Sequence, residues 1–265
     1  MNRRREQRVP LEMITLPFLA TREEDQQPFE YLLVDVSPSG AQFAIPKWAV
    51  SRERLVQDTV INLHLSVLHE GSSFVKAKVV RSYFDDKLYS EVCAVSLFQK
   101  MPNHSPFSIS ALDAGIVADL TRLDSLPAYL SRVIKDCSLL KKGVAVYLKH
   151  LIPYLSRIGG YAEADYPMLK DVVLSQIRDK VLKNHAALHT LHQEITAHCS
   201  DAKQIPRLLN LEELRALIES EIYPDVFAAA FQSESVAPYI SAIKELEGKL
   251  YGNYNIAVMI YLLSL

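Results

Sequence analysis

The feature that most constrains the fold is a change of period in the apolar residues near residue 100. Before it, apolar and polar residues alternate: in VINLHLSVL, Ile61 and Leu63 share one face of an extended chain, and Asn62 and His64 share the other. After it, apolar residues recur every three or four positions, as on one face of a helix. Strands followed by helices indicate separate layers or domains. We therefore predict an α+β multidomain protein.

The first hundred residues predict a compact all-β domain. Alternating segments bounded by turn residues predict strands over 8–16, 29–36, 40–45 and 88–98, and a hairpin over 60–82 that turns at 69–73. The alternation over 60–68 is typical of a strand with one buried face. Five or six short antiparallel strands in this length predict a small barrel or sandwich over 1–100.

The stretch QKMPNHSPFS contains two prolines and few apolar residues, so we predict a linker over 101–107. An α-helical domain over 108–265 is expected to follow. Its apolar periodicity predicts helices over the segments 113–123, 127–140, 143–158, 166–185, 210–222 and 237–263. Asp113, Ser125 and Asp165 stand where N-caps are expected, and the two glycines at 159–160 indicate a helix end.

Charge is evenly spread except at one place. Residues 1–100 carry 13 Lys and Arg against 13 Asp and Glu, and residues 101–265 carry 16 against 18. Neither half is basic, which argues against a long nucleic acid as partner. Arg3, Arg4, Arg5 and Arg8 nevertheless lie within six positions, a local cluster that suits a small anion or a solvated tail.

Cysteine usage and hydropathy predict a cytoplasmic protein. Its three cysteines, Cys93, Cys137 and Cys199, form no CxxC pair, as expected in a reducing compartment. No apolar run follows the N-terminal arginines, so we expect no signal peptide. The run IAVMIYLLSL has about half the length needed to cross a bilayer, so we expect no membrane-spanning segment.

A second motif gives the arginine cluster a meaning. In LLVDVSPSGAQF, the motif Asp35-x-Ser37-x-x-Gly40 ends one apolar strand and precedes another. Pro38 and Gly40 favour a tight turn, which projects the carboxylate and the hydroxyl from one edge. These two groups can bind the amino and imino edge of a guanine, while arginine can stack on a purine or clamp a phosphate. Together they indicate a small guanine nucleotide as ligand.

RxxxR at Arg4 to Arg8, 26 intervening residues and DxSxxG at Asp35 to Gly40 resemble the PilZ domain, the bacterial receptor for cyclic di-GMP. The resemblance covers roughly residues 3–100 and implies a six-stranded barrel that binds this nucleotide. By position it implies that Arg4 and Arg8 wrap the phosphates and stack on guanine. Asp35 and Ser37 would bind a guanine edge, and Gly40 would allow close backbone approach. Arg3 and Arg5 are expected helpers outside the motif.

Other chemistry finds less support. His185, His189 and His192 have the i, i+4, i+7 spacing of one helix face, but no HExxH or matching carboxylate accompanies them. We interpret them as a polar stripe of an amphipathic helix and predict no metal site. No GxSxG, P-loop or GxGxxG motif is present, so we predict a protein that is not an enzyme and needs no cofactor.

The predicted helical domain has no family resemblance that we recognise. We expect it to be the output module, which binds a protein partner and relays the cyclic di-GMP level to motility, adhesion or exopolysaccharide production. The alternative is an adaptor in which the barrel is only a scaffold and protein contacts alone carry the function.

Overall fold

In the computed structural model the chain divides into two compact units. The barrel unit comprises Met1–Asp124 and Tyr254–Leu263, and the helical unit comprises Ser125–Asn253 and Ser264–Leu265. The structure describes residues 9–10, 18–24, 27–37, 39–47, 55–64, 74–99, 107–110, 115–118, 125–158, 176–221 and 237–265.

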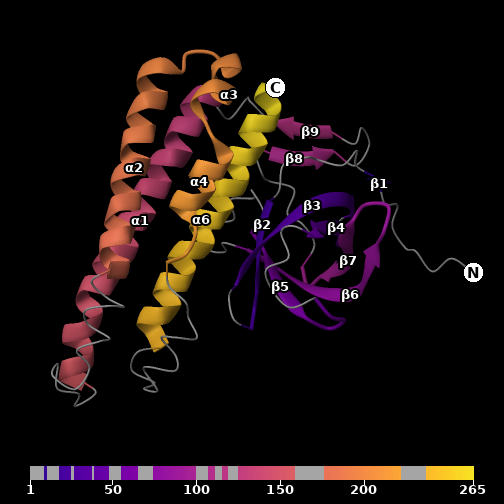
Figure 1. Ribbon diagram of the computed structural model, residues 1–265, viewed down its shortest axis with the longest axis horizontal. Helices are drawn as coiled ribbons and strands as arrows, with labels where there is room; N and C mark the ends of the chain where they lie inside the picture. Colours follow the sequence, from indigo (N-terminus) through magenta and orange to yellow (C-terminus); the bar gives the residue numbers. More distant parts are fainter. Residues whose placement is uncertain are drawn as a thin grey trace, which may run out of the picture. The chain divides into compact units, whose positions relative to one another are not determined.

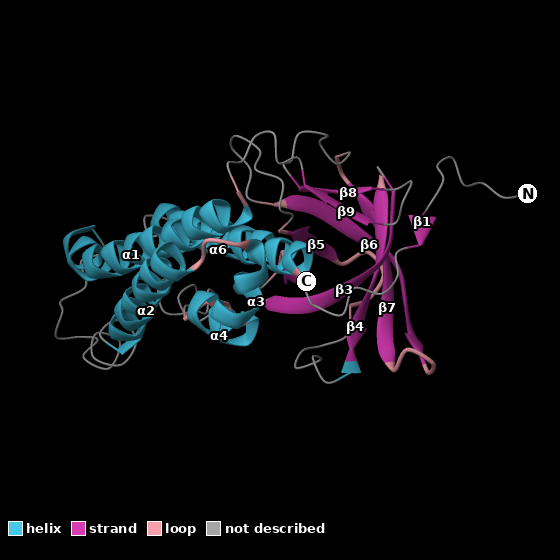
Figure 2. Ribbon diagram, turned by 90° about the horizontal axis from the view of Figure 1, so that it is seen from above, coloured by secondary structure: helices cyan, strands magenta, loops and turns pink. Residues whose placement is uncertain are grey.

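Six antiparallel strands of the barrel unit close on themselves (Figure 1). They are β2 (Phe18–Arg22), β3 (Pro28–Ser37), β4 (Gly40–Pro46), β5 (Val60–Leu63), β6 (Val75–Asp85) and β7 (Ser90–Leu97). Their order is β3-β2-β5-β6-β7-β4, and β4 pairs with β3 to complete the circle. Closure removes the exposed strand edges that an open sheet would leave. The predicted antiparallel barrel is confirmed, and Figure 2 shows its strands in magenta.

Aromatic side chains fill the barrel interior. The Phe43 side chain is fully buried, with its ring centroid 5.2 Å from that of Tyr31 and 6.2 Å from that of Phe29. Tyr31 and Phe29 lie two residues apart on β3, so the alternation of a strand sends both inward. Burying side chains of this size stabilises the fold by roughly 1.5–3 kcal/mol each. The inward alternation of β3 and β4 therefore decides which residues remain on the outer face.

Two features of the strands differ from prediction. β2 was not predicted, because its sequence FLATR is buried almost throughout and so does not alternate. β5 was predicted to have one buried face, yet Asn62 and His64 are as buried as Ile61 and Leu63. Both differences have one cause, because a further segment of the barrel unit covers the outside of these strands.

That segment is the end of α6 (Ala237–Ser264), from Tyr254 onwards. The Asn255 side-chain amide accepts a hydrogen bond from Leu19 N (2.8 Å) and donates to Leu19 O (3.0 Å) and His64 O. It thus continues the ladder where the pairing of β2 with β5 ends at Ala20 and Leu63. A segment predicted for the helical domain belongs, by its contacts, to the barrel unit.

The segment after the barrel begins with a hairpin rather than a helix. β8 (Phe107–Ser110) pairs with β9 (Gly115–Ala118), so the predicted helix over 113–123 is wrong at 115–118. The motif GIVA is apolar at three positions, and β-branched Ile116 and Val117 favour the extended form. Of the predicted linker over 101–107, only Phe107 lies within the described residues.

The helical unit is built on two long helices that pack side by side, α1 (Leu126–Ile158) and α2 (Ile177–His198) (Figure 1). Shorter helices follow: η5 (Ala202–Gln204), α3 (Ile205–Leu208) and α4 (Leu211–Ile218), and then most of α6. Ser125 caps α1, since its Oγ accepts a hydrogen bond from Ala128 N at 3.2 Å, as predicted. A barrel followed by helices confirms the predicted fold class.

One predicted helix boundary is wrong. The segments 127–140 and 143–158 form a single helix that passes through Gly143. A Cβ atom at Gly143 would lie 3.3 Å from Leu246 Cδ1 of α6, so the glycine permits close helix packing instead of a break. α1 ends at Ile158, directly before the two glycines expected to stop it. Among the described residues, no helix combines the length and apolarity needed to cross a bilayer.

Candidate functional site

The DxSxxG motif forms the hairpin between β3 and β4. Ser37 stands opposite Gly40 in the register, and Ser37 Oγ donates a hydrogen bond to Gly40 O at 3.2 Å. Leu97 N of β7 donates to Ser39 O at 2.9 Å, which ties the turn to the neighbouring strand. Ser37 and Gly40 are buried, and Asp35 is half-buried. The turn is thus fixed on two sides, with the Asp35 carboxylate at its open edge.

β1 (Val9–Pro10) lies beside the strand that leads into this turn. It pairs antiparallel with β3, with Val9 opposite Val36 and Pro10 opposite Asp35. The predicted arginines Arg3, Arg4, Arg5 and Arg8 lie outside the described residues. The strand that follows Arg8 in sequence therefore reaches the strand that carries Asp35, although 24 residues separate Pro10 from Asp35 in the chain.

The outer face of the barrel continues the site across three more strands. Asp35 is paired with Gln42 of β4, Gln42 with Ala94 of β7, and Ala94 with Arg81 of β6. Directly paired residues of an antiparallel sheet project from the same face, so these four form one row. Arg81 Nη2 donates to Gln42 Oε1 at 3.2 Å, across the small Ala94.

Gln42 and Arg81 are members of this row that sequence reasoning missed. Gln42 follows DxSxxG by two positions, so its place on the same face could have been inferred from alternation. Arg81 lies 46 positions after Asp35, and a bulge between Val79 and Arg81 shifts its register. Because a bulge changes the face of every residue after it, alternation alone could not place Arg81.

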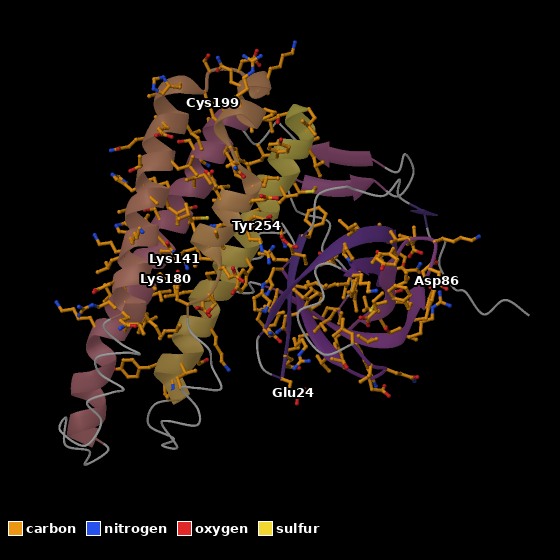
Figure 3. The ribbon with its side chains drawn as sticks, viewed as in Figure 1. Glu24, Asp86, Lys141, Lys180, Cys199 and Tyr254 are labelled. Atoms are coloured by element: carbon orange, nitrogen blue, oxygen red, sulfur yellow. The ribbon has the colours of Figure 1, made fainter. Side chains whose placement is uncertain are left out.

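The helical unit contains a separate buried polar cluster around Lys141 of α1, which is labelled in Figure 3. Lys141 Nζ lies 2.7 Å from Glu221 Oε2 and donates a hydrogen bond to Glu219 O at 2.9 Å. The side chains of Lys141 and Glu221 are at most 2% exposed. Asn184 of α2 donates to the other Glu221 oxygen. This network satisfies a buried ion pair and joins α1, α2 and the end of α4.

Glu247 of α6 extends this cluster. Its Oε1 accepts a hydrogen bond from Ser220 Oγ at 2.5 Å, and its side chain is buried. Burial raises the pKa of Glu247 to about 7, although the Ser220 hydrogen bond and the Lys141 charge oppose the increase. Because Lys141, Glu221 and Glu247 are all buried, we interpret the cluster as a structural network.

The histidine stripe serves helix packing. His185 Nδ1 lies 2.9 Å from Ser138 O of α1, and His192 Nδ1 lies 3.1 Å from Ser131 O. Both the histidines and the serines are seven residues apart, so the two contacts repeat along an antiparallel helix pair. Within the described part of the chain, no group of three or more His, Cys, Asp or Glu residues could hold a metal ion.

Comparison with known proteins agrees with the barrel and its two motifs. Residues 2–107 match the PilZ domain family. The match contains the arginine cluster, DxSxxG and all six strands of the barrel, and it confirms the resemblance stated from the motifs. The PilZ domain is a family of cyclic di-GMP receptors, which supports a receptor function at the level of the family.

One solved structure similar to this chain is a PilZ domain with c-di-GMP of YcgR from Escherichia coli. The two sequences are 17% identical, and the match covers 38% of this chain and 82% of that chain, with a TM-score of 0.27. No curated protein matched the chain. The helices after residue 125 lie outside the PilZ match.

Proposed function

We propose that the PilZ domain of this protein binds cyclic di-GMP and that the protein is a receptor rather than an enzyme. The observation that carries the proposal is the pairing of β1 with β3. It sets the two residues that directly follow RxxxR in sequence beside the strand that bears Asp35 and Ser37. Family membership supports the ligand, and the pairing supports one shared site.

The turn supplies hydrogen-bond acceptors for a guanine edge. The Asp35 carboxylate accepts only, which suits the imino and amino N–H groups of guanine. Ser37 Oγ directs its proton to Gly40 O, so its remaining lone pairs can accept from the same edge. Gly40, opposite Ser37, adds no side chain that would hold a ligand away from the backbone.

The arginines supply the complementary charge. Arg8 directly precedes β1 in the sequence, and Arg4 lies four positions earlier. Guanidinium groups bind phosphate oxygens bidentately and stack on purines, so Arg4 and Arg8 would hold the phosphates and cover a base. Arg3 and Arg5 would add further charge from the same arm.

Isothermal titration with cyclic di-GMP tests this site in the full-length protein. Loss of a charge-assisted contact costs about 1.5–3 kcal/mol, or roughly ten- to hundredfold in affinity. We expect Arg8→Ala and Asp35→Ala each to weaken binding by this factor, and Lys87→Ala, an exposed change in the β6–β7 turn, to leave it unchanged. Unchanged affinity in both site variants would overturn the assignment. A wild-type protein that does not bind would favour the adaptor alternative.

We further propose that the helical unit relays ligand binding to a protein partner in motility, adhesion or exopolysaccharide production. It has exposed apolar side chains, among them Leu139 and Val146, seven residues apart on α1. Coupling requires the ligand to favour one of two arrangements of the barrel and the helices, with 101–107 as hinge.

Spin labels at the exposed positions Asp86 and Lys180 would report such a change, because all three native cysteines are buried. We expect the distance distribution between the labels to shift when cyclic di-GMP is added. If the distances stay fixed and the isolated PilZ domain binds with full-length affinity, the helical unit is uncoupled from the ligand.

A further inference from the structure

Arg81 stands at the end of the row of paired residues that begins at Asp35. Its side chain crosses Ala94 and reaches Gln42, so its guanidinium lies one strand away from the strand of Asp35. Neighbouring strands are about 4.8 Å apart, which brings this cation within the span of a dinucleotide bound at Asp35. No sequence motif that we identified contains Arg81.

Few large side chains project from the sheet between Asp35 and Arg81. A second row runs beside the first, in which Ser37 is paired with Gly40, Gly40 with Ser96, and Ser96 with Lys78. The four middle positions are Gln42 and Ala94 in the first row and Gly40 and Ser96 in the second, and three of these four have small side chains. A flat ligand can lie on this part of the sheet, with the acceptors of β3 on one side and the Arg81 guanidinium of β6 on the other.

The contacts of the two cations differ. Lys78 Nζ already forms an ion pair with Asp58, at 2.6 Å. Within the described part of the chain, the contacts of the Arg81 guanidinium are the neutral Gln42 amide and the Tyr83 ring, whose centroid is 5.9 Å from Arg81 Cζ. Arg81 is exposed, and a guanidinium has five N–H donors. It therefore keeps donors and an uncompensated charge for an anion.

The ligand needs such a cation on this side. Cyclic di-GMP carries two phosphodiester charges, and Asp35 adds a third negative charge to the site, so electrostatic repulsion has to be offset nearby. β1, which directly follows the arginines in sequence, pairs with one side of β3. Arg81 of β6 reaches Gln42 of β4, and β4 pairs with the other side of β3.

We propose that Arg81 is a further nucleotide-binding residue, whose guanidinium contacts a phosphate of the cyclic di-GMP bound at Asp35 and Ser37. This inference rests on the proposed function. Gln42 positions the guanidinium over Ala94 when the site is empty, and Tyr83 supports it from below. The nucleotide is then held between arginines that arrive from two directions.

Titration calorimetry with cyclic di-GMP tests the proposal in the full-length protein. We expect Arg81→Ala to weaken binding roughly ten- to hundredfold and to reduce the salt dependence of the affinity, because one phosphate contact is lost. Arg81→Lys should retain a large part of the affinity, since the charge remains. Lys78→Ala is the matched control and should change the affinity less than threefold.

The outcomes separate this inference from the proposed function. If the wild type binds and Asp35→Ala weakens binding, but Arg81→Ala behaves like Lys78→Ala, then the Arg81 assignment is wrong and the site stands. If Arg81→Lys lowers the affinity as much as Arg81→Ala does, the contact depends on the planar guanidinium and not on its charge. The proposed phosphate contact is then wrong. If the wild type does not bind cyclic di-GMP, the proposed function itself fails. Circular dichroism confirms that each variant is folded.

Discussion

Replacing Lys141 by Met should strongly destabilise the helical unit. The substitution removes the cation of a pair whose two side chains are at most 2% exposed, while it preserves side-chain volume. Glu221 would keep its hydrogen bond from Asn184 but would lose its counter-charge, and Glu219 O would lose a donor. Removing one partner of a buried ion pair costs about 3–5 kcal/mol, and we expect a loss in this range.

The ion pair itself contributes much less than this loss. Desolvating both charges offsets most of their attraction, so a neutral pair of similar size can be nearly as stable. We therefore expect the double variant Lys141→Met/Glu221→Gln to recover more than half of the stability lost in Lys141→Met. The adjacent Lys142→Met is the matched control, because Lys142 is exposed on the same helix and should change stability by less than about 0.5 kcal/mol.

Urea denaturation followed by circular dichroism at 222 nm measures these free energies, since most of that signal comes from the helices. Two results would refute the reasoning. In the first, Lys141→Met lowers the free energy of unfolding no more than Lys142→Met does, so the buried charge of Lys141 does not contribute to stability. In the second, the double variant is no more stable than Lys141→Met, so the loss of stability does not come from the Glu221 charge left without its counter-charge.

Three further predictions concern other parts of the molecule. Because burial raises the pKa of Glu247 from 4.5 to about 7, its contribution to stability is complete below pH 4.5 and is lost as the pH rises towards 7. Glu247→Gln should remove about 3 kcal/mol of this decline in denaturation experiments at pH 5 to 8; an unchanged pH profile would contradict it. Asn255→Ala should cost roughly 3 kcal/mol, since it removes three buried hydrogen bonds to Leu19 and His64. Its signature is faster amide exchange at Leu19, and unaltered exchange there would contradict the role of Asn255. Cyclic di-GMP should slow amide exchange over 3–7, and equal rates with and without ligand would argue against phosphate contacts by the arm.

Local sequence signals predicted the parts of the fold that depend on near neighbours. The turn of DxSxxG lies between two alternating strands, and the structure has β3 and β4 on either side of it. Ser125 could be identified as an N-cap because a cap needs only its own helix. The two motifs also indicated the resemblance to the PilZ family, because each motif is defined by residue types at fixed spacing.

Signals that depend on distant neighbours were misread or missed. The sequence was divided into two helices between residues 140 and 143, yet the structure has one helix there, in which Leu246 closely approaches Gly143. The GIVA segment fits a helical period, but pairing with β8 makes it a strand. The sequence also contains no sign that Lys141, one of two adjacent lysines, is buried.

The amino-acid sequence by itself determined the change from strands to helices, the β3–β4 turn and the residue types of the proposed nucleotide site. These follow from side-chain alternation, helix periodicity and turn chemistry, all of which act over a few residues. Tertiary structure decided three other features: Arg81 beside Gln42, the Lys141–Glu221 pair and the addition of Asn255 to the barrel. Each joins residues between 39 and 236 positions apart, and such contacts depend on strand register and helix packing.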